Sequence, residues 1–223
     1  ISAGVTRLDS ARELARKARY VVMAVKPYQI EALLAEMAPE FGPDTVVISV
    51  AAGISIARLQ AAVAGRCPVV RCMPNTPALV GKGVFALCFD DKVPAESKED
   101  ILRFFSQLGV CLELPESRFT AFSALIGAGP AYVFGMMQGL VQAGVTLGLG
   151  RKDCRDMVAA LFEGSAVMAA RSDTPLMELR DQVCSPGGLT IAGVNVLDRA
   201  GLSGLLVDAV LAADERGREM EKE

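Results

Sequence analysis

The feature that most constrains the fold is an alternation of short β-branched runs with amphipathic helical segments in the first half of the chain. Three runs, Tyr20–Val25, Thr45–Val50 and Pro68–Met73, have the length and valine content of buried strands. Apolar residues at helical spacing follow the first two runs. Strands that alternate with helices in this way predict a parallel, doubly wound sheet with helices packed against it.

The second half of the chain has a different pattern. From about Glu116 the apolar spacing is helical only, whereas residues 84–114 still alternate strand, helix and strand. We therefore expect an α/β domain over residues 1–115 and an all-helical domain over residues 116–223. The additional elements that we expect in the first domain are a helix over Asp9–Ala18, strands over Val84–Phe89 and Val110–Leu114, and a helix over Ala95–Leu108.

The helical half contains a long stretch without charge. Phe119–Gly150 has no charged residue, which is long enough to span a bilayer. It nevertheless contains seven glycines, Pro130, Gln138 and Gln142. A helix that is apolar on every face must be buried, and a domain of this size offers little interior. We expect burial between the subunits of a homodimer, with a membrane span as the alternative.

Composition excludes several kinds of chemistry. The chain has no histidine, which removes Ser–His and Cys–His nucleophiles, histidine-ligated metals and an imidazole acid. The net charge of −3 without a Lys/Arg cluster argues against a nucleic-acid partner. Six scattered cysteines with no C-x-x-C pair predict reduced thiols and no metal site. No signal peptide is visible, so we expect a cytoplasmic protein.

A glycine turn before a helix is the best candidate for a ligand site. Ser185-Pro186-Gly187-Gly188 is followed directly by Leu189, Thr190 and an apolar run. Two glycines let the backbone bend and leave no Cβ between the turn and a ligand. The helix start presents unpaired N–H groups that suit an anion such as a carboxylate. The alternative is an ordinary helix start capped by a Ser or Thr hydroxyl.

Small residues gather where the predicted strands end. They occupy Ala24–Pro27, Ala51–Gly53 and Met73–Thr76. Ligands of doubly wound sheets bind at the carboxyl ends of the strands, where small side chains let a dinucleotide approach the backbone. The alternative is that these residues only form tight strand-to-helix turns.

These stretches together resemble the pyrroline-5-carboxylate reductases. The motifs occur in the family's order and approximate spacing, and the resemblance runs from about Tyr20 to Arg218. It implies a Rossmann-like doubly wound sheet followed by an all-α dimerisation domain. It also implies hydride transfer from NADPH or NADH to 1-pyrroline-5-carboxylate, giving L-proline, in dimers that often assemble into decamers. The motifs are Ala24-Val25-Lys26-Pro27, Ala51-Ala52-Gly53, Met73-Pro74-Asn75-Thr76-Pro77, Gly129-Pro130-Ala131-Tyr132 and the turn at Ser185–Thr190.

The resemblance also implies roles for particular residues. Thr190 is expected to hydrogen-bond the imine nitrogen as the catalytic residue, while the amides of Gly188, Leu189 and Thr190 hold the substrate carboxylate. Asp173 is expected near the substrate amine or, slightly favoured, as a helix cap. Cys184 and Gln182 depart from the family, which usually has a hydroxyl residue and an Asn there. Ser185 and Gly187 complete the predicted substrate site, and the predicted cofactor residues are Ala24, Val25, Lys26, Pro27, Ala51, Ala52, Gly53, Pro74, Asn75, Thr76 and Gln182.

The Gly-x-Gly-x-x-Gly phosphate loop of dinucleotide-binding folds is missing from the sequence. In the family it lies upstream of the position that corresponds to Ile1, so we expect it in a preceding segment. Gly127-Ala128-Gly129-Pro130 is not a substitute, because Tyr132 stands at the third glycine position and Pro130 lacks an N–H. The residue that selects NADH or NADPH is expected in the same preceding segment, so the sequence leaves that choice open.

Two other functions remain open from the sequence. One is a related two-domain NAD(P)-dependent oxidoreductase acting on another small imine or on a keto or hydroxy acid. Enzymes of that kind that act on hydroxy acids use a lysine of the helical domain, where Lys152 is the only interior lysine. The other is a non-catalytic dimer that binds a nucleotide.

Overall fold

The protein forms two compact units. The computed structural model describes residues 4–221. One unit contains the chain up to Ala128 together with the segment from Ala213 onward, and the other is Gly129–Ala212. The domain boundary that the sequence predicts, between residues 115 and 116, stays a prediction. Residues 1–3 and 222–223 lie outside the described residues.

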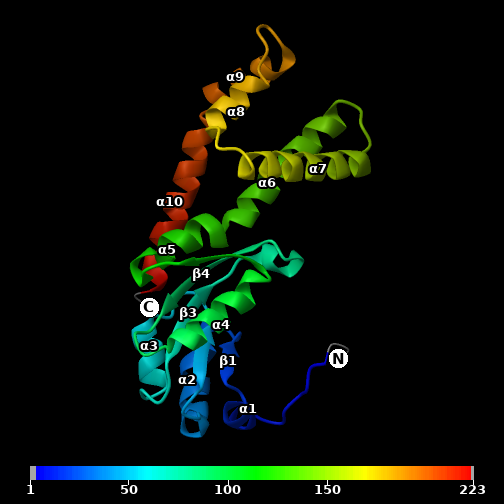
Figure 1. The fold of residues 1–223 in the computed structure, drawn as a ribbon. Coiled ribbons are helices and arrows are strands. Elements are labelled where there is room, and N and C mark those ends of the chain that lie inside the picture. Colours follow the sequence, from blue (N-terminus) through cyan, green and yellow to red (C-terminus); the bar gives the residue numbers. More distant parts are fainter. Residues whose placement is uncertain (1–3, 222–223) are drawn as a thin grey trace. The chain divides into compact units, whose positions relative to one another are not determined.

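The first unit is built on a five-stranded sheet in the order β1-β2-β3-β4-β5 (Figure 1). The fold class that the sequence predicts is confirmed, but the sheet is mixed rather than parallel. β4 runs antiparallel to β3 because a short 3₁₀ turn, η2 (Thr76–Val80), connects them, and a parallel pairing needs a much longer crossover. The strands are β1 (Tyr20–Met23), β2 (Val46–Ser49), β3 (Val69–Met73), β4 (Gly83–Phe89) and β5 (Gly109–Glu113).

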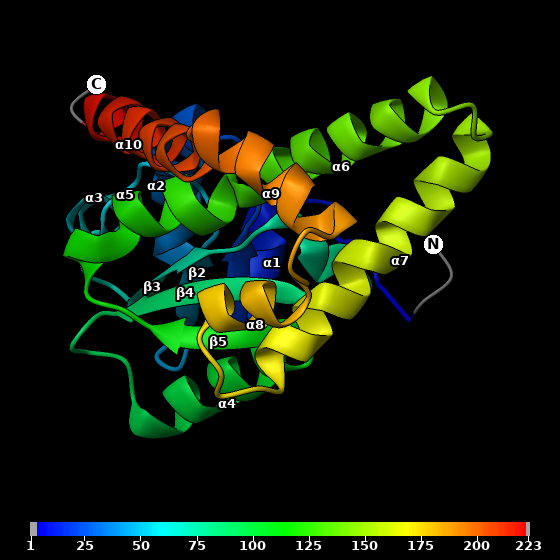
Figure 2. The same cartoon turned by 90° about the horizontal axis from the view of Figure 1, so that it is seen from above.

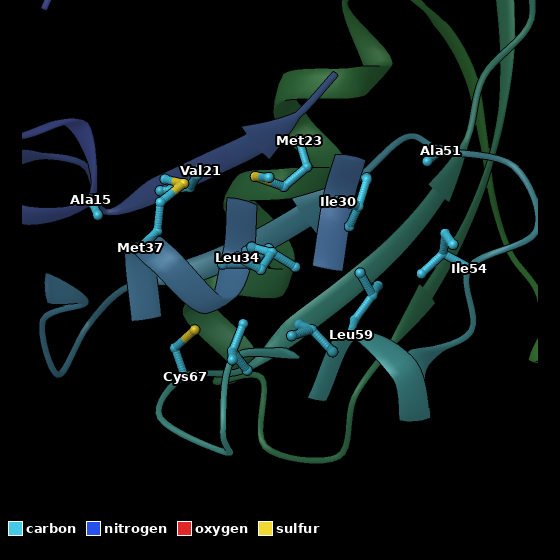
Figure 3. Packing of buried hydrophobic residues seen from close by; sticks show 13 residues of the cluster. Ala15, Val21, Met23, Ile30, Leu34, Met37, Ala51, Ile54, Leu59 and Cys67 are labelled. Carbon is cyan, nitrogen blue, oxygen red and sulfur yellow. The ribbon is translucent and has the colours of Figure 1, made fainter. Parts of the chain in front are cut away.

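One face of the sheet is covered by α1 (Ala11–Lys17), α2 (Pro27–Met37) and α3 (Ile56–Ala62). Ser10 and Ser55 cap the first and third of these helices by accepting backbone N–H groups, and Pro27 opens the second. The 3₁₀ turn η1 (Ala38–Glu40) follows α2 directly. The buried cluster beneath these helices is drawn in Figure 3 and includes Ala15, Val21, Ile30, Leu34, Met37, Leu59 and Val63.

The opposite face is covered by α4 (Ala95–Ser106). Figure 2 shows this helix across the sheet from α2 and α3. Ile101 and Phe105 of α4 pack on strand residues such as Phe85, whose ring lies 5.1 Å from that of Phe105. The side chains of alternate strand residues therefore enter two separate cores.

After β5 the chain turns helical through η3 (Glu116–Arg118), α5 (Phe119–Phe122) and the π-helical turn η4 (Ser123–Gly127). Phe119 and Phe122 are buried against Ala86 of β4, in a third apolar cluster. A π-turn inserts an extra residue into the helix, and such turns often occur at functional sites. It directly precedes the Gly129-Pro130 helix start, and this stretch forms no phosphate-binding loop.

The second unit consists of α6 (Gly129–Thr146), α7 (Arg151–Ala170), α8 (Leu176–Gln182), α9 (Leu189–Arg199) and the first part of α10 (Leu202–Met220). α6 and α7 are in contact, and Gly144 leaves room for the Cys154 sulfur. Within one chain this unit has little core. Exposed apolar side chains include Phe134, Leu147, Leu161, Met168 and Leu205.

One helical run has the length and composition of a membrane span. Glu116–Thr146 has a mean hydropathy of 1.4, and only 11% of its most apolar window is buried within the chain. Core helices of proteins that never enter a bilayer can have the same length and composition. Within the second unit, exposed apolar residues of α6 and α7 such as Phe134 and Leu161 leave apolar surface that the chain does not cover.

Candidate functional site

The predicted substrate turn connects α8 to α9. Gly187 has a φ of +69°, the left-handed region that glycine adopts without strain. The Gly188 N–H donates to the Ser185 carbonyl oxygen at 3.0 Å, which closes the turn. A Cβ at position 188 would overlap the Ser185 hydroxyl. The two positions of the motif therefore require glycine for different reasons. Position 187 requires it for its backbone conformation, and position 188 because a side chain has no space there.

The helix that follows the turn starts without a side-chain cap. Gly188 is the N-cap of α9, and no side-chain oxygen accepts a hydrogen bond there. The alternative in which a Ser or Thr hydroxyl caps this helix is therefore wrong. Thr190 lies in the first turn of α9 with an exposed side chain. The first amides of α9 are left for another acceptor, as an anion site requires.

An arginine links the two helices that flank the turn. The Arg180 guanidinium of α8 lies 3.4 Å from the Asp198 carboxylate of α9 and 2.9 Å from Asp181. Its hydrogen bond to Asp181 and its proximity to Asp198 raise the pKa of Arg180. Because α8 and α9 join only through the turn, this arrangement helps to fix the turn's geometry.

Two other predicted residues lie on the same unit. Asp173 is exposed in the segment between α7 and α8, and the N-cap of α8 is Pro175 without a side-chain hydrogen bond. The slightly favoured interpretation of Asp173 as a helix cap is therefore wrong, because Pro175 holds that position. Gln182 is the last residue of α8 and is exposed. Its predicted contact with the cofactor stays a prediction.

The predicted cofactor residues of the first unit lie at one edge of the sheet. β1, β2 and β3 are parallel, so Ala24–Pro27, Ala51–Gly53 and Pro74–Thr76 all follow the carboxyl ends of neighbouring strands. Lys26 is the N-cap of α2 and its N–H donates to the Gln29 side chain at 3.2 Å. Ala51 is buried and Ala52 is exposed, while Gly53 has a φ of +76°.

Asn75 has a structural role that the sequence did not predict. Its Oδ1 accepts the Val84 N–H at 2.9 Å, and its Nδ2 donates to the Ile126 carbonyl oxygen at 3.3 Å. Both ends of the amide are therefore used, and the segment after β3 is fixed to β4 and to the π-helical turn. The Asn75 side chain therefore shapes this part of the cofactor edge, and its predicted contact with the cofactor stays a prediction.

A hollow of about 250 Å³ opens beside the predicted cofactor edge. Ala52 and Gly53 line it together with Thr120, Ala124 and a buried arginine, Arg71. Sequence reasoning missed Arg71, although a lone charge inside the apolar run Val69–Met73 was a usable signal.

The remaining reactive side chains are the acidic groups, the cysteines and Lys152. Among residues 4–221 no group of three His, Cys, Asp or Glu side chains could hold a metal ion. All six cysteines are free, and Cys67, Cys72 and Cys154 are buried. Burial raises the pKa of Cys67 to about 11 and that of Cys72 to about 12, so neither is a nucleophile near neutral pH. Lys152 is exposed and pairs with Asp156 at 2.9 Å.

Comparison with known proteins matches two stretches of the chain to family models. Residues 116–220 match the model for pyrroline-5-carboxylate reductase dimerisation, and residues 2–53 match the model for NADP oxidoreductase, coenzyme F420-dependent. A pyrroline-5-carboxylate reductase of Corynebacterium melassecola is 37% identical over 98% of this chain and 82% of its own. The enzyme of the same name from Pisum sativum is 36% identical over 98% of this chain and 80% of its own.

Solved structures agree with these relatives. The pyrroline carboxylate reductase of Plasmodium falciparum, crystallised with NADP bound, superposes with a TM-score of 0.91 at 32% identity. The match covers 99% of this chain and 84% of that one. A pyrroline-5-carboxylate reductase from Coxiella burnetii gives a TM-score of 0.90 at 31% identity, over 97% of this chain and 81% of that one.

Proposed function

Because the chain belongs to the pyrroline-5-carboxylate reductase family, we propose that it reduces 1-pyrroline-5-carboxylate to L-proline with NADPH or NADH, the last step of proline biosynthesis. It is an NAD(P)-dependent oxidoreductase acting on a C=N bond. The single observation that carries the site assignment is the uncapped start of α9 behind the Gly187-Gly188 turn.

The dinucleotide would be held by the edge at which β1, β2 and β3 end. The small residues there, and Gly53 with its positive φ, leave the backbone open to close approach. Ala24–Pro27, Ala51–Gly53 and Pro74–Thr76 would form its walls, with Gln182 as a further contact. When bound, the nicotinamide supplies the hydride that the protein's own side chains cannot provide.

The substrate would be held by the turn before α9. The amides of Leu189 and Thr190 would donate to the substrate carboxylate, and the positive end of the helix dipole adds to this attraction. The third predicted amide, that of Gly188, donates to the Ser185 carbonyl oxygen instead and closes the turn. Ser185 and Gly187 keep the turn in shape. The Thr190 hydroxyl would hydrogen-bond the imine nitrogen and orient the ring, and the exposed Asp173 would lie near the same nitrogen.

A strong protein acid is not needed for this reaction, because a ring imine is easily protonated. The chain has no histidine, and its helical half offers Lys152 only as an exposed ion pair with Asp156. This pairing argues against the related oxidoreductases that use a lysine as the acid. The residues of the chain are thus left to bind and orient, a role that the Gly188–Thr190 turn can fill.

The assembly follows from the apolar surface of the second unit. The match to a dimerisation family supports a homo-oligomer, and we propose a homodimer through the helical domain that assembles further into a decamer. Burial of the exposed apolar side chains of α6 between subunits would keep them away from a membrane. The acidic net charge argues against nucleic acid, and the free cysteines fit a cytoplasmic enzyme.

The decisive experiment is an assay of NADPH and NADH oxidation by the complete polypeptide with 1-pyrroline-5-carboxylate. Thr190→Ala should lower kcat/KM by about 10- to 150-fold, which corresponds to roughly 1.5–3 kcal/mol for a hydrogen bond to a charged group. Thr190→Ser is the matched control, since it keeps the hydroxyl and should retain most of the activity. An unchanged kcat/KM in Thr190→Ala removes Thr190 from the mechanism.

The same assay separates the two alternatives. Nucleotide binding without turnover on this substrate, but with turnover on another small imine or a keto or hydroxy acid, identifies a related oxidoreductase. Binding without turnover on any of them identifies a nucleotide-binding dimer.

A further inference from the structure

Arg71 is a buried cation that the proposed reaction does not use. We propose that it is a positioning residue of the cofactor edge: acting through Glu116, it fixes the chain between the end of β2 and the start of α3. This inference rests on the proposed function, since the Ala51–Gly53 stretch is the predicted cofactor wall.

Arg71 carries its charge into the interior of the first unit. It is only 5% exposed and lies in β3 among Val69, Val70 and Cys72. A buried charge is costly unless it is paired and hydrogen-bonded. Arg71 is paired twice, with Nη1 at 3.0 Å from the Glu116 carboxylate and Nη2 at 3.1 Å from that of Glu221.

Packing holds the guanidinium in this position. It lies 4.7 Å from the centre of the Phe119 ring, close enough for a cation–π contact. β3, η3 and the end of α10 therefore meet at one side chain, together with α5. A planar guanidinium can donate to two carboxylates at once, which a lysine ammonium on a flexible stem does with less defined geometry.

Glu116 contacts the start of α3 as well as Arg71. The Oε1 atom that Arg71 contacts also accepts the N–H of Ile56, at 2.7 Å. Ile56 is the first residue of α3, so a carboxylate from 60 residues further along the chain satisfies one of the free amides of this helix. The guanidinium keeps that carboxylate in place, and the carboxylate keeps the helix start in place.

The contact between Glu116 and Ile56 lies at one end of the segment that contains the predicted cofactor residues Ala51–Gly53. Arg71 pairs with Ser49 in the register of β2 and β3, and the Ser49 hydroxyl accepts the Ala51 N–H at 3.4 Å. Ser49 and Ile56 are the two fixed ends of a short segment that contains Ala51–Gly53. Within it Gly53 adopts a left-handed conformation. Because glycine has no side chain, this part of the backbone would be free to move if no other contact held it. The Glu116 contact removes that freedom at the α3 end.

Arg71 positions rather than catalyses. Arginine stays protonated and has no acceptor, so it cannot exchange a proton with a substrate, and both of its carboxylate partners are already engaged. Its removal would leave Glu116 without its cation, and the Ile56 amide would lose a fixed acceptor. The expected result is a mobile Ala51–Ile56 segment within an otherwise folded unit.

The test uses the complete polypeptide and two measurements that need no turnover: hydrogen exchange of the Ile56 amide without nucleotide, and the Kd for NADPH by fluorescence titration. Arg71→Gln should speed exchange at Ile56 and raise the Kd roughly tenfold, because a displaced wall loses contacts of fixed geometry. Arg71→Lys should restore part of both. Glu116→Gln should resemble Arg71→Gln in exchange at Ile56.

Glu221→Gln is the matched control. It removes an ion pair of nearly the same length from the same guanidinium but leaves the Glu116–Ile56 contact intact. It should therefore keep the Ile56 exchange rate, and its Kd should stay within about twofold of the wild-type value. If Arg71→Gln does not fold, Arg71→Lys and Glu116→Gln decide by the same measurements.

The proposal is overturned if Arg71→Gln and Glu221→Gln lower the thermal stability alike while Ile56 exchange and the Kd stay at wild-type values. It is also overturned if exchange rises evenly over the whole first unit, since Arg71 would then only stabilise the fold. Failure of the reductase assignment gives a different result: wild-type protein that binds NADPH without reducing 1-pyrroline-5-carboxylate, with the Ile56 response to Arg71→Gln unchanged.

Discussion

The hydroxyl of Ser185 occupies the space that a Cβ at Gly188 would need. Such a Cβ would also lie 3.2 Å from the Ser185 carbonyl oxygen, which accepts the Gly188 N–H. The backbone of Gly188 has a φ of −78°, which any residue can adopt, so contact rather than conformation requires glycine here.

Gly188→Ala should therefore displace the turn while the helix persists. The Ser185 hydroxyl must rotate and the turn must open by a few tenths of an ångström, so the substrate amides shift. We expect kcat/KM to fall roughly tenfold, with most of the loss in the KM for 1-pyrroline-5-carboxylate. Steady-state kinetics with both substrates varied will measure it.

Gly193→Ala in the same helix is the control for this substitution. A Cβ at Gly193 meets no atom within 4 Å, and alanine is the better helix former. Its activity should remain at the wild-type level. If Gly188→Ala behaves like Gly193→Ala, the close approach at Ser185 has no functional consequence.

Asn75→Ala should destabilise the first unit. The substitution leaves the Val84 N–H and the Ile126 carbonyl group without the partners that the amide provides, at a cost of about 1–3 kcal/mol. Urea unfolding will measure this free energy. Gln29→Ala is the control, because the Gln29 amide accepts the Lys26 N–H at an exposed position and should cost only a few tenths of that. Equal losses would contradict the role assigned to Asn75.

Phe134→Lys should dissociate the oligomer. Phe134 lies on the uncharged helix α6 with 63% of its surface exposed in the single chain. A charge there would be buried in the subunit interface, so the dimer Kd should rise at least thirtyfold, or about 2 kcal/mol. Light scattering across a dilution series will measure it. Tyr28→Lys, on the exposed surface of α2 in the first unit, should leave the oligomeric state unchanged.

Stability should fall in alkaline solution. Burial raises the pKa of Cys67 and Cys72 from about 9 to about 11 and 12, so above pH 9 the unfolded chain loses protons that the folded chain retains. The free energy of unfolding then decreases as pH rises from 9 toward 11, by at most about 1.4 kcal/mol per pH unit for each thiol. Urea unfolding at pH 7.5 and pH 10 will measure it, and Cys67→Ala should show a smaller difference. An equal difference would contradict the assignment to Cys67.

Much of the fold was predictable because it depends on local patterns. The runs Tyr20–Val25, Thr45–Val50 and Pro68–Met73 became β1, β2 and β3, each within two residues at either end. The direction of β4 was not predictable from its own residues. It depends on how the short η2 turn leads the chain back along β3, and a valine-rich segment pairs in either direction.

Some features of the candidate site were likewise predictable from local patterns, and others were not. Glycine spacing and small residues after strands predict the Ser185–Thr190 turn and the cofactor edge that we propose, because both depend on backbone conformation and space. The Asp173 cap was wrong, since the choice among neighbouring cap positions is made by the packing of the helix start. Pro175 holds that position.

The sequence by itself determined the order of strands and helices and the exclusion of histidine chemistry, and it supplied the two stretches that we propose as ligand-binding. Each follows from residue type and spacing. Only the tertiary structure decided which distant groups meet, such as Arg71 with Glu116 and Glu221, 45 and 150 residues further along the chain. A charged residue in a buried strand predicts that a partner of opposite charge is present. Which carboxylate comes within reach depends on how distant parts of the chain fold together.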